Sequence, residues 1–146
     1  MKQPLFLLIF LLYICTTSAQ TPQPEKWTFT TEKKNSDEYV LIFKVTLEPQ
    51  WHMYSQFTDE GGPLPMVYNF SDSICFTRIG TVVEPAPHLE FDSVFMVNVK
   101  TFDGEVTFKQ TIKVNSPDCL VKGNIQYQIC KEMCIFKEIE FTFTLD

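Results

Sequence analysis

The stretch that decides the fold lies near the C-terminus and reads Gly123-Asn-Ile-Gln-Tyr-Gln-Ile-Cys130-Lys-Glu-Met-Cys134-Ile-Phe-Lys-Glu-Ile-Glu-Phe-Thr-Phe-Thr-Leu145. Polar and apolar residues alternate over 124–129 and again over 138–145, which is the period expected of β-strands. Only three residues separate Cys130 from Cys134, a length that suits the loop of a hairpin. The sequence therefore predicts a β-hairpin with one cysteine on each side of its loop.

The two cysteines face each other in this predicted hairpin. Facing residues of an antiparallel ladder have Cα atoms about 4.5–5.5 Å apart, within the range that a disulfide requires. The register places the cysteines on the more polar face, where a partner protein can reach a thiol. The predicted pairs on that face are Gln128–Phe136, Gln126–Glu138 and Asn124–Glu140, and those on the other face are Ile129–Ile135, Tyr127–Lys137 and Ile125–Ile139.

A bridge across so short a loop has two interpretations. It removes little entropy from the unfolded chain, so it stabilises the fold weakly compared with a bridge that closes a long loop. This favours a redox role over a structural one, although the spacing alone fits both.

Residues 1–19 have the pattern of a secretory signal peptide. Lys2 supplies the positive charge, residues 5–15 form an apolar run too short to cross a bilayer, and Ala19 ends a run of small residues suited to cleavage. No second apolar stretch reaches membrane length, so we expect an exported protein without stable membrane insertion after cleavage. An uncleaved anchor is the alternative.

The remaining chain has the length of one domain, which we expect as a flexible leader over 20–26 and a folded domain over 27–146. The sequence holds 12 Lys and Arg against 18 Asp and Glu, a formal net charge of −6. This balance argues against nucleic acid or an anionic membrane surface as a partner. Of the five cysteines, all but Cys15 lie beyond the signal peptide. Their even number in an exported chain suggests disulfides, with three possible connectivities.

Short strands separated by turns account for the rest of the domain. Residues 39–47 place Tyr39, Leu41, Phe43, Val45 and Leu47 on one face. Further strands are expected at 27–31, 66–70, 74–79, 94–102 and 105–114. With no helical periodicity, this spacing predicts an all-β, immunoglobulin-like β-sandwich of eight to nine strands, with a closed barrel as the alternative.

Two of these local predictions concern residues 86–114. Asp103-Gly104 is a turn pair favoured in type I′ hairpins, so we expect 94–102 to pair with 105–114. Residues 86–93 are expected to form a loop, because Pro85 and Pro87 argue against a central strand. The expected facing pairs of the hairpin are Phe95–Ile112, Val97–Gln110, Val99–Phe108 and Thr101–Val106.

Several motifs together resemble one known family. The most specific is the approach to the cysteine pair, Gly-x-x-x-Tyr-Gln-x-Cys, which begins at Gly123. The others are Trp51-His-Met-Tyr54, Gly61-Gly-Pro-Leu-Pro65, Gly80-Thr-Val-Val-Glu-Pro85 and Phe108-Lys-Gln110. From about residue 51 to 145 the chain resembles the N-terminal periplasmic domain of the thiol:disulfide interchange protein DsbD and its stand-alone relatives.

The resemblance implies an immunoglobulin-like fold whose redox-active pair is Cys130 and Cys134. It also implies a cap loop that lays an aromatic ring over the disulfide, for which Phe91 is the best match, with Glu90 and Asp92 as nearby acids. The alternative is an ordinary surface loop with Phe91 packed into the core. Lys131 beside Cys130 would favour a thiolate, and Glu132 would oppose it.

The same resemblance implies location, partners and cofactors. The domain would lie in the periplasm and accept electrons from a thioredoxin-like domain or a membrane electron transporter. It would reduce exported proteins that carry disulfides, would need a partner for turnover, and would use no cofactor or metal. Cys75 and Cys119 would be structural, either bridged or packed as buried thiols.

Two departures from the family pattern stand out. The family usually has a longer spacer between its cysteines, and it often has proline after the second one, where this chain has Ile135. One interpretation is that the shorter loop strains the disulfide and makes it more oxidising. The alternative is that the activity has drifted from that of the family.

Two other classes of function compete with thiol–disulfide exchange. A copper- or metal-binding chaperone would use the Cys-x3-Cys pair with His52 and Met53, but the His and Met that follow such a pair in copper sites are absent from 135–140. A non-redox interaction module would keep inert, structural disulfides. Hydrolase and transferase motifs are absent, and two histidines leave little room for acid–base catalysis.

Overall fold

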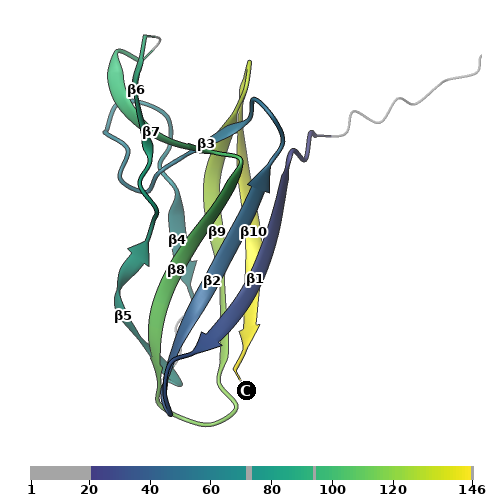
Figure 1. Cartoon of the computed structure of the whole chain (residues 1–146), viewed down its shortest axis with the longest axis vertical. Coiled ribbons are helices and arrows are strands. Elements are labelled where there is room, and N and C mark those ends of the chain that lie inside the picture. The colour runs from purple at the N-terminus through teal and green to yellow at the C-terminus, as the bar shows by residue number, and fades with distance from the viewer. Residues whose placement is uncertain (1–20, 72–73, 94, 146) are drawn as a thin grey trace, which may run out of the picture.

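The computed structural model describes residues 21–71, 74–93 and 95–145, which form ten strands and no helix. The expected signal peptide, 1–19, lies outside the described residues, and within them nothing has the helical length and hydropathy of a membrane span. The strands, labelled in Figure 1, are β1 (Glu25–Lys33), β2 (Glu38–Leu47), β3 (His52–Tyr54), β4 (Val67–Phe70), β5 (Phe76–Val83), β6 (His88–Asp92), β7 (Val97–Asp103), β8 (Glu105–Val114), β9 (Leu120–Cys130) and β10 (Cys134–Thr144).

The strands form two sheets that pack face to face. One has the order β1-β2-β8-β5, and the other has the order β10-β9-β3-β7-β6, with β4 also paired to β9. The core between them is rich in aromatic rings: Phe43 of β2 lies 5.1 Å from both Phe141 and Phe143 of β10, measured between ring centroids. The expected immunoglobulin-like sandwich is confirmed, and two strands, β3 and β6, add to the elements that the sequence predicted.

Alternation predicted the buried faces of the long strands correctly. In β2, the side chains of Tyr39, Leu41, Phe43, Val45 and Leu47 are all buried. In the hairpin of β9 and β10, every predicted pair is observed, from Cys130 opposite Cys134 to Asn124 opposite Glu140. Ile125, Tyr127 and Ile129 of β9 face the core, so the cysteines lie on the outer face of their sheet.

The prediction of a hairpin between 94–102 and 105–114 around Asp103-Gly104 is wrong. β7 pairs with β3 and β6, whereas β8 pairs with β2 and β5 in the other sheet. Gly104 does adopt a positive φ of 61°, but its turn carries the chain from one sheet to the other. The rings of Phe102 and Phe108 therefore meet across the sandwich, 5.4 Å apart, rather than along one sheet.

The loop expected at 86–93 is also wrong in part, because His88–Asp92 forms β6, which pairs with β7 at the edge of the sheet. The two prolines precede this strand and so remove no hydrogen bond from it, and an edge strand tolerates them nearby. The strand matters for the site because it brings residues 90–92 alongside β7.

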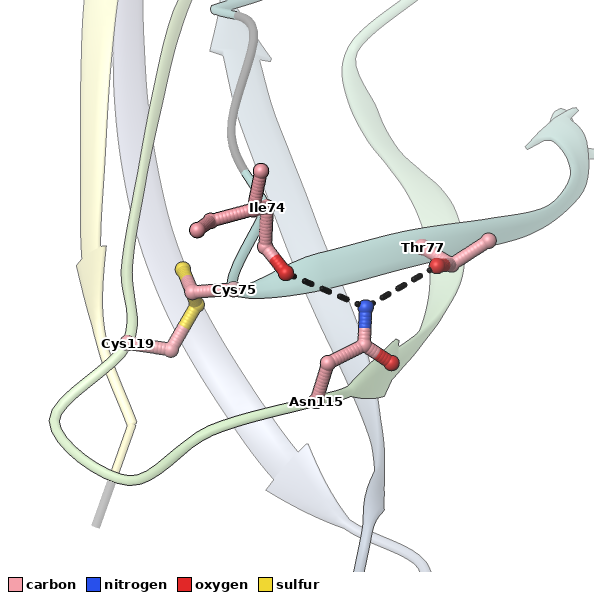
Figure 2. Close-up of a disulfide and its surroundings, with 5 residues drawn as sticks. All are labelled: Ile74, Cys75, Thr77, Asn115 and Cys119. Carbon is pink, nitrogen blue, oxygen red and sulfur yellow. Dashed lines mark hydrogen bonds between the residues drawn. A yellow bond between two sulfur atoms is a disulfide. The ribbon is translucent and has the colours of Figure 1, made fainter.

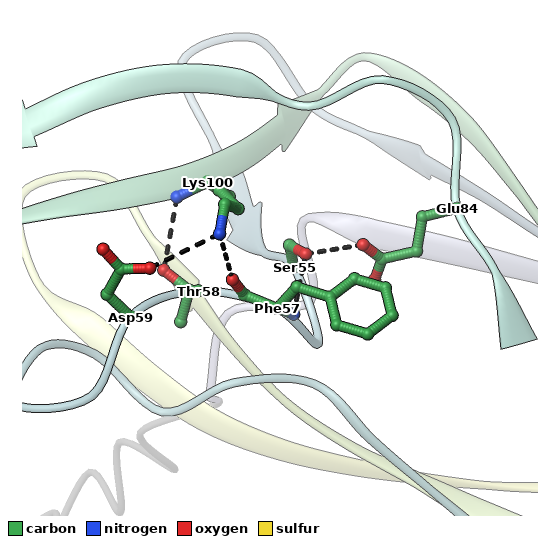
Figure 3. A network of polar contacts seen from close by, with 6 residues as sticks. All are labelled: Ser55, Phe57, Thr58, Asp59, Glu84 and Lys100. Atoms are coloured by element: carbon green, nitrogen blue, oxygen red, sulfur yellow. Dashed lines mark hydrogen bonds and ion pairs between the residues drawn. The ribbon is translucent and has the colours of Figure 1, made fainter. Parts of the chain in front are cut away.

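A polar network fixes the segment that follows β3 (Figure 3). The Ser55 hydroxyl, which is fully buried, donates to Glu84 Oε2 at 2.5 Å, and Gln56 N donates to Glu84 Oε1 at 2.9 Å. Lys100 Nζ of β7 donates to the carbonyl of Phe57 at 2.6 Å. These bonds hold the end of β3 against β7 and the chain beyond β5.

The N-terminal strand is tied to the opposite sheet at its first residues. Glu25 accepts a hydrogen bond of 2.9 Å from the Tyr127 hydroxyl, which in turn accepts one of 3.1 Å from Trp27 Nε1. β1 thus begins inside the segment expected as a flexible leader, because its first carboxylate has a partner on β9.

Candidate functional site

The Cys130–Cys134 disulfide closes the loop between β9 and β10, at the upper end of the molecule in Figure 1. The Cα atoms lie 4.1 Å apart, close to the spacing of the narrower facing pair in an antiparallel ladder. Within the loop, Lys131 N donates to the carbonyl of Met133 at 3.2 Å. The ladder of β9 and β10 places Cys130 directly opposite Cys134.

The two cysteines differ in exposure. Cys130 is buried, with 3% of its surface exposed, against Tyr54 of β3 and Val99 of β7. Cys134, on the outer strand of the sheet, is exposed. The expectation that a partner can reach the pair holds for Cys134 and not for Cys130.

A pocket of about 460 Å³ opens beside the disulfide. It brings together both cysteines, the loop between them, and residues of β3, β6 and β7. Glu90, Phe91 and Asp92, which the sequence analysis selected from a distant segment, all line it. Phe91 is 59% exposed, so it is not packed into the core.

The structure places beside the cysteine pair a residue that the sequence analysis considered only as a metal ligand. His52 of β3 lies directly opposite Cys130 of β9 on one side and Asp103 of β7 on the other. Its Nε2 lies 3.1 Å from the Tyr54 hydroxyl, and the two rings meet edge to face with centroids 5.3 Å apart. Both residues line the pocket of the disulfide.

Burial and acidic neighbours act in opposite directions on the pKa of His52 and in the same direction on the pKa of Tyr54. Burial lowers the pKa of His52, and the negative charges of Glu90, Asp103 and Asp92 raise it in part, leaving it below its ordinary value. Burial, with Asp92 and Glu90, raises the pKa of Tyr54. Near neutral pH the pair is therefore an uncharged imidazole beside an uncharged phenol.

One motif of the sequence indicates that His52 and Tyr54 lie on the same face of their strand. In Trp51-His-Met-Tyr54 the buried Met53 belongs to the main core, so His52 and Tyr54 must point to the other face. What the sequence could not supply was the strand that lies beside them.

The second pair of cysteines, Cys75 and Cys119, is also bridged, with Cα atoms 5.5 Å apart (Figure 2). Cys119 is buried with the main core. The Asn115 side chain secures the same corner by donating to the carbonyl of Ile74 and to the Thr77 hydroxyl, at 3.3 and 3.1 Å. This bridge joins the start of β5 to the connection between β8 and β9.

A metal centre finds little support in this geometry. Over the described ranges, no group of three or more His, Cys, Asp or Glu side chains is arranged to hold a metal ion. The disulfide occupies both thiols, and Met53 faces the core rather than the pocket.

Comparison with known proteins identifies the family of this chain. Residues 18–146 match the family model described as "Thiol:disulfide interchange protein DsbD, N-terminal", which confirms the resemblance seen in the motifs. The fold is similar to that of the N-terminal periplasmic domain of ScsB from Proteus mirabilis, with a TM-score of 0.63 and 20% identity over 83% of this chain and 46% of that chain.

A second similar structure is the Neisseria meningitidis DsbD n-terminal domain in the reduced form. It aligns with a TM-score of 0.49 and 16% identity over 80% of this chain and 83% of that chain. No curated protein gives a significant match. This chain spans less than half of the ScsB chain, and at 20% identity that likeness shows the fold alone.

Proposed function

This chain belongs to the family of the DsbD N-terminal domain, a thiol–disulfide exchange module, and on that premise we propose that it passes reducing equivalents through Cys130 and Cys134 to disulfides of exported proteins. The observation that carries the proposal is the disulfide itself. It lies at the tip of a hairpin, beside a pocket, with one sulfur exposed and the other buried.

The exchange proceeds in two displacements. A donor thiolate attacks the exposed Cys134 sulfur, the Cys130–Cys134 bond breaks, and Cys130 leaves as a thiolate that takes up a proton. A second donor thiolate attacks the donor sulfur of this mixed disulfide, which releases Cys134 and leaves the donor oxidised. The reduced pair then transfers the same two electrons to an acceptor disulfide by the reverse steps.

β6 serves as the cap in this proposal. Phe91 lies in the wall of the disulfide pocket, and Glu90 and Asp92 line the same pocket from either side of it in sequence. An aromatic ring there shields the disulfide from small thiols, and a docking partner displaces it. The two carboxylates place negative charge where a thiolate would form, which disfavours the free thiolate.

The proposed setting is the periplasm, reached with residues 1–19 as the signal peptide. The donor is a thioredoxin-like domain or a membrane electron transporter, and the acceptors are exported proteins with disulfides. Since the module stores only two electrons, it needs such a donor for turnover.

The reduction potential of the Cys130–Cys134 pair tests the function. The protein is equilibrated in thiol buffers and each cysteine pair is quantified by mass spectrometry, so that Cys75–Cys119 serves as an internal control. We expect a value between about −270 and −120 mV for Cys130–Cys134, the span of exchange proteins, and a value below about −300 mV for the control. If Cys130–Cys134 also falls below about −300 mV, the domain is an interaction module with structural disulfides.

A further inference from the structure

Among the titratable side chains that line the pocket, His52 is the one whose ordinary pKa lies near neutral pH. It is the ladder partner of Cys130, and facing residues of an antiparallel pair have Cβ atoms about 4.5–5.5 Å apart on one face of the sheet. Cys130 cannot exchange a proton freely with water, because only 3% of its surface is exposed. A proton that enters or leaves this sulfur therefore needs a neighbouring group.

The surroundings hold the imidazole in place. The Tyr54 hydroxyl, 3.1 Å from Nε2, fixes the ring from one side, and Tyr54 is itself buried. Asp103 lies opposite His52 on β7, on the side away from Cys130. The charged and titratable groups around His52 are Tyr54 on its own strand, Glu90 and Asp92 on β6, Asp103 on β7, Cys130 on β9, Lys131 and Glu132 in the loop, and Cys134 on β10.

We propose that His52 is the group that accepts the proton from the Cys130 thiol and returns it during exchange, an inference that rests on the proposed redox function. In the mixed disulfide between Cys134 and an acceptor, the Cys130 thiol gives its proton to the imidazole and its sulfur attacks the Cys134 sulfur. The Cys130–Cys134 bond forms, the bond from Cys134 to the acceptor breaks, and the acceptor sulfur leaves as a thiolate. The imidazolium then protonates that thiolate.

The acidic neighbours suit this role. An imidazolium that forms beside Cys130 is stabilised by the negative charges of Glu90, Asp103 and Asp92, each of which raises the pKa of His52. Burial keeps the resting imidazole neutral and therefore ready to accept a proton. In the opposite direction, the neutral imidazole first takes the proton of the incoming donor thiol, and the imidazolium then passes that proton to Cys130 as it leaves.

The test uses a protein whose Cys130 is its only free thiol. In Cys134→Ala the Cys75–Cys119 bridge is retained, and the alkylation rate of Cys130 by iodoacetamide is measured from pH 5 to 10. Adding His52→Gln should lower that rate about tenfold near pH 7, the effect of raising the thiol pKa by one unit, and the two profiles should converge near pH 10. His52→Asn is a second variant at the same position, in case His52→Gln does not fold. Circular dichroism shows whether each variant is folded.

The matched control is His88→Gln, since His88 is the other histidine of the chain and does not line the pocket. His88 Nε2 lies 3.9 Å from Asp103 Oδ1, so this variant also shows what a change beside Asp103 does when His52 is kept. It should leave the profile unchanged. Superimposable profiles with and without His52, or a rate reduced equally at every pH, would overturn the inference. The reduction potential of the unmutated pair is measured separately. A potential in the range of structural disulfides would refute the redox function, whereas an unchanged alkylation profile would refute only the role of His52.

Discussion

At the scale of single residues, the two sulfur atoms of the redox pair differ in access to solvent. Cys134 is exposed on an outer strand, and Cys130 is buried against Tyr54 and Val99. A displacement requires the attacking sulfur to approach along the disulfide axis, so access decides which sulfur a partner meets first. In the proposed exchange, Cys134 is therefore the sulfur that meets the partner, and Cys130 is the resolving cysteine.

Single-cysteine variants test this direction. We expect Cys130→Ala, which keeps Cys134, to react with a small aromatic disulfide at pH 8.5 at least about tenfold faster than Cys134→Ala, a difference of about 1.4 kcal/mol in the barrier. Release of the aromatic thiol is followed by absorbance. In denaturant both variants should react at similar rates, because burial is then lost. Equal rates in the native proteins would contradict the assignment.

His52 also predicts how stability depends on pH. Its folded-state pKa lies below its ordinary value, mainly because of burial, so the unfolded chain binds more protons as the pH falls through the range below about 6.5. The free energy of unfolding should therefore decrease in that range, and it should decrease less in His52→Gln. Urea unfolding at several pH values measures both slopes.

The control for that experiment is again His88→Gln. His88 is an exposed side chain on β6, and its replacement should retain the steeper slope of the unmodified protein. Parallel slopes for His52→Gln and the unmodified protein would mean that burial does not disfavour the charged imidazole.

The residues of the site were predictable to different degrees. Cys130 and Cys134 follow from alternation and loop length, because both act within one hairpin. Glu90, Phe91 and Asp92 were selected by resemblance alone, since nothing local indicates that a segment some forty residues away lies beside the cysteines. His52 was considered only as a possible metal ligand, because a role beside Cys130 depends on which strand lies next to β3.

At the scale of elements, β6 is the edge strand through which the disulfide pocket borders on solvent. It pairs with β7 alone at the edge of its sheet, so its outer side has no neighbouring strand among the described residues. Phe91 lies opposite Asn98 and Leu89 lies opposite Lys100, so the two apolar side chains share one side of the strand. Only Phe91 belongs to the pocket of the disulfide.

This pair of side chains allows a matched test of the cap. We expect Phe91→Ala to speed the reduction of Cys130–Cys134 by dithiothreitol roughly fivefold, about 1 kcal/mol of barrier, because the ring no longer shields the sulfur atoms. Leu89→Ala, which removes a side chain that is 72% exposed on the same strand, should leave the rate unchanged. Samples are quenched with acid at set times and freed of dithiothreitol, and the appearance of protein thiols that react with a fluorescent maleimide gives the rates. If both variants behave alike, Phe91 is an ordinary surface residue.

The elements also show why the sequence misplaced a hairpin. Alternation in 97–103 and 105–114 states correctly that each strand has a buried side. It does not show whether the buried side chains of the two strands lie next to each other on one sheet or face each other from two sheets. Phe102 and Phe108 face each other from two sheets. The hairpin of β9 and β10 escaped this ambiguity, because its two cysteines and short loop allow few other arrangements.

At the scale of the whole molecule, the two disulfides lie at opposite ends of the sandwich. Cys119 directly precedes β9 and Cys130 ends it, so the eleven residues of that strand separate them by roughly 35 Å at about 3.3 Å per residue. The lower end in Figure 1 holds the connection between β8 and β9, and the upper end holds the redox pair. One end can therefore be fixed covalently while the other opens and closes.

The two bridges should also differ in their effect on stability. Cys75 and Cys119 are 44 positions apart, whereas Cys130 and Cys134 are only 4 apart. Chain-entropy estimates give about 4 kcal/mol for the longer loop and about 2 kcal/mol for the shorter one. We expect Cys75→Ala/Cys119→Ala to lose about twice as much free energy of unfolding as Cys130→Ala/Cys134→Ala, with urea unfolding as the measurement.

This difference is what an exchange module requires. Each cycle breaks Cys130–Cys134, and a domain that depended on that bridge would unfold when reduced. Since β9 and β10 pair over eleven positions and their inner faces belong to the main core, the reduced hairpin should keep its register. The double variant at 130 and 134 should thus retain a cooperative unfolding transition. An equal or greater loss for that variant would mean that the redox pair is the structural bridge, and would count against exchange as its role.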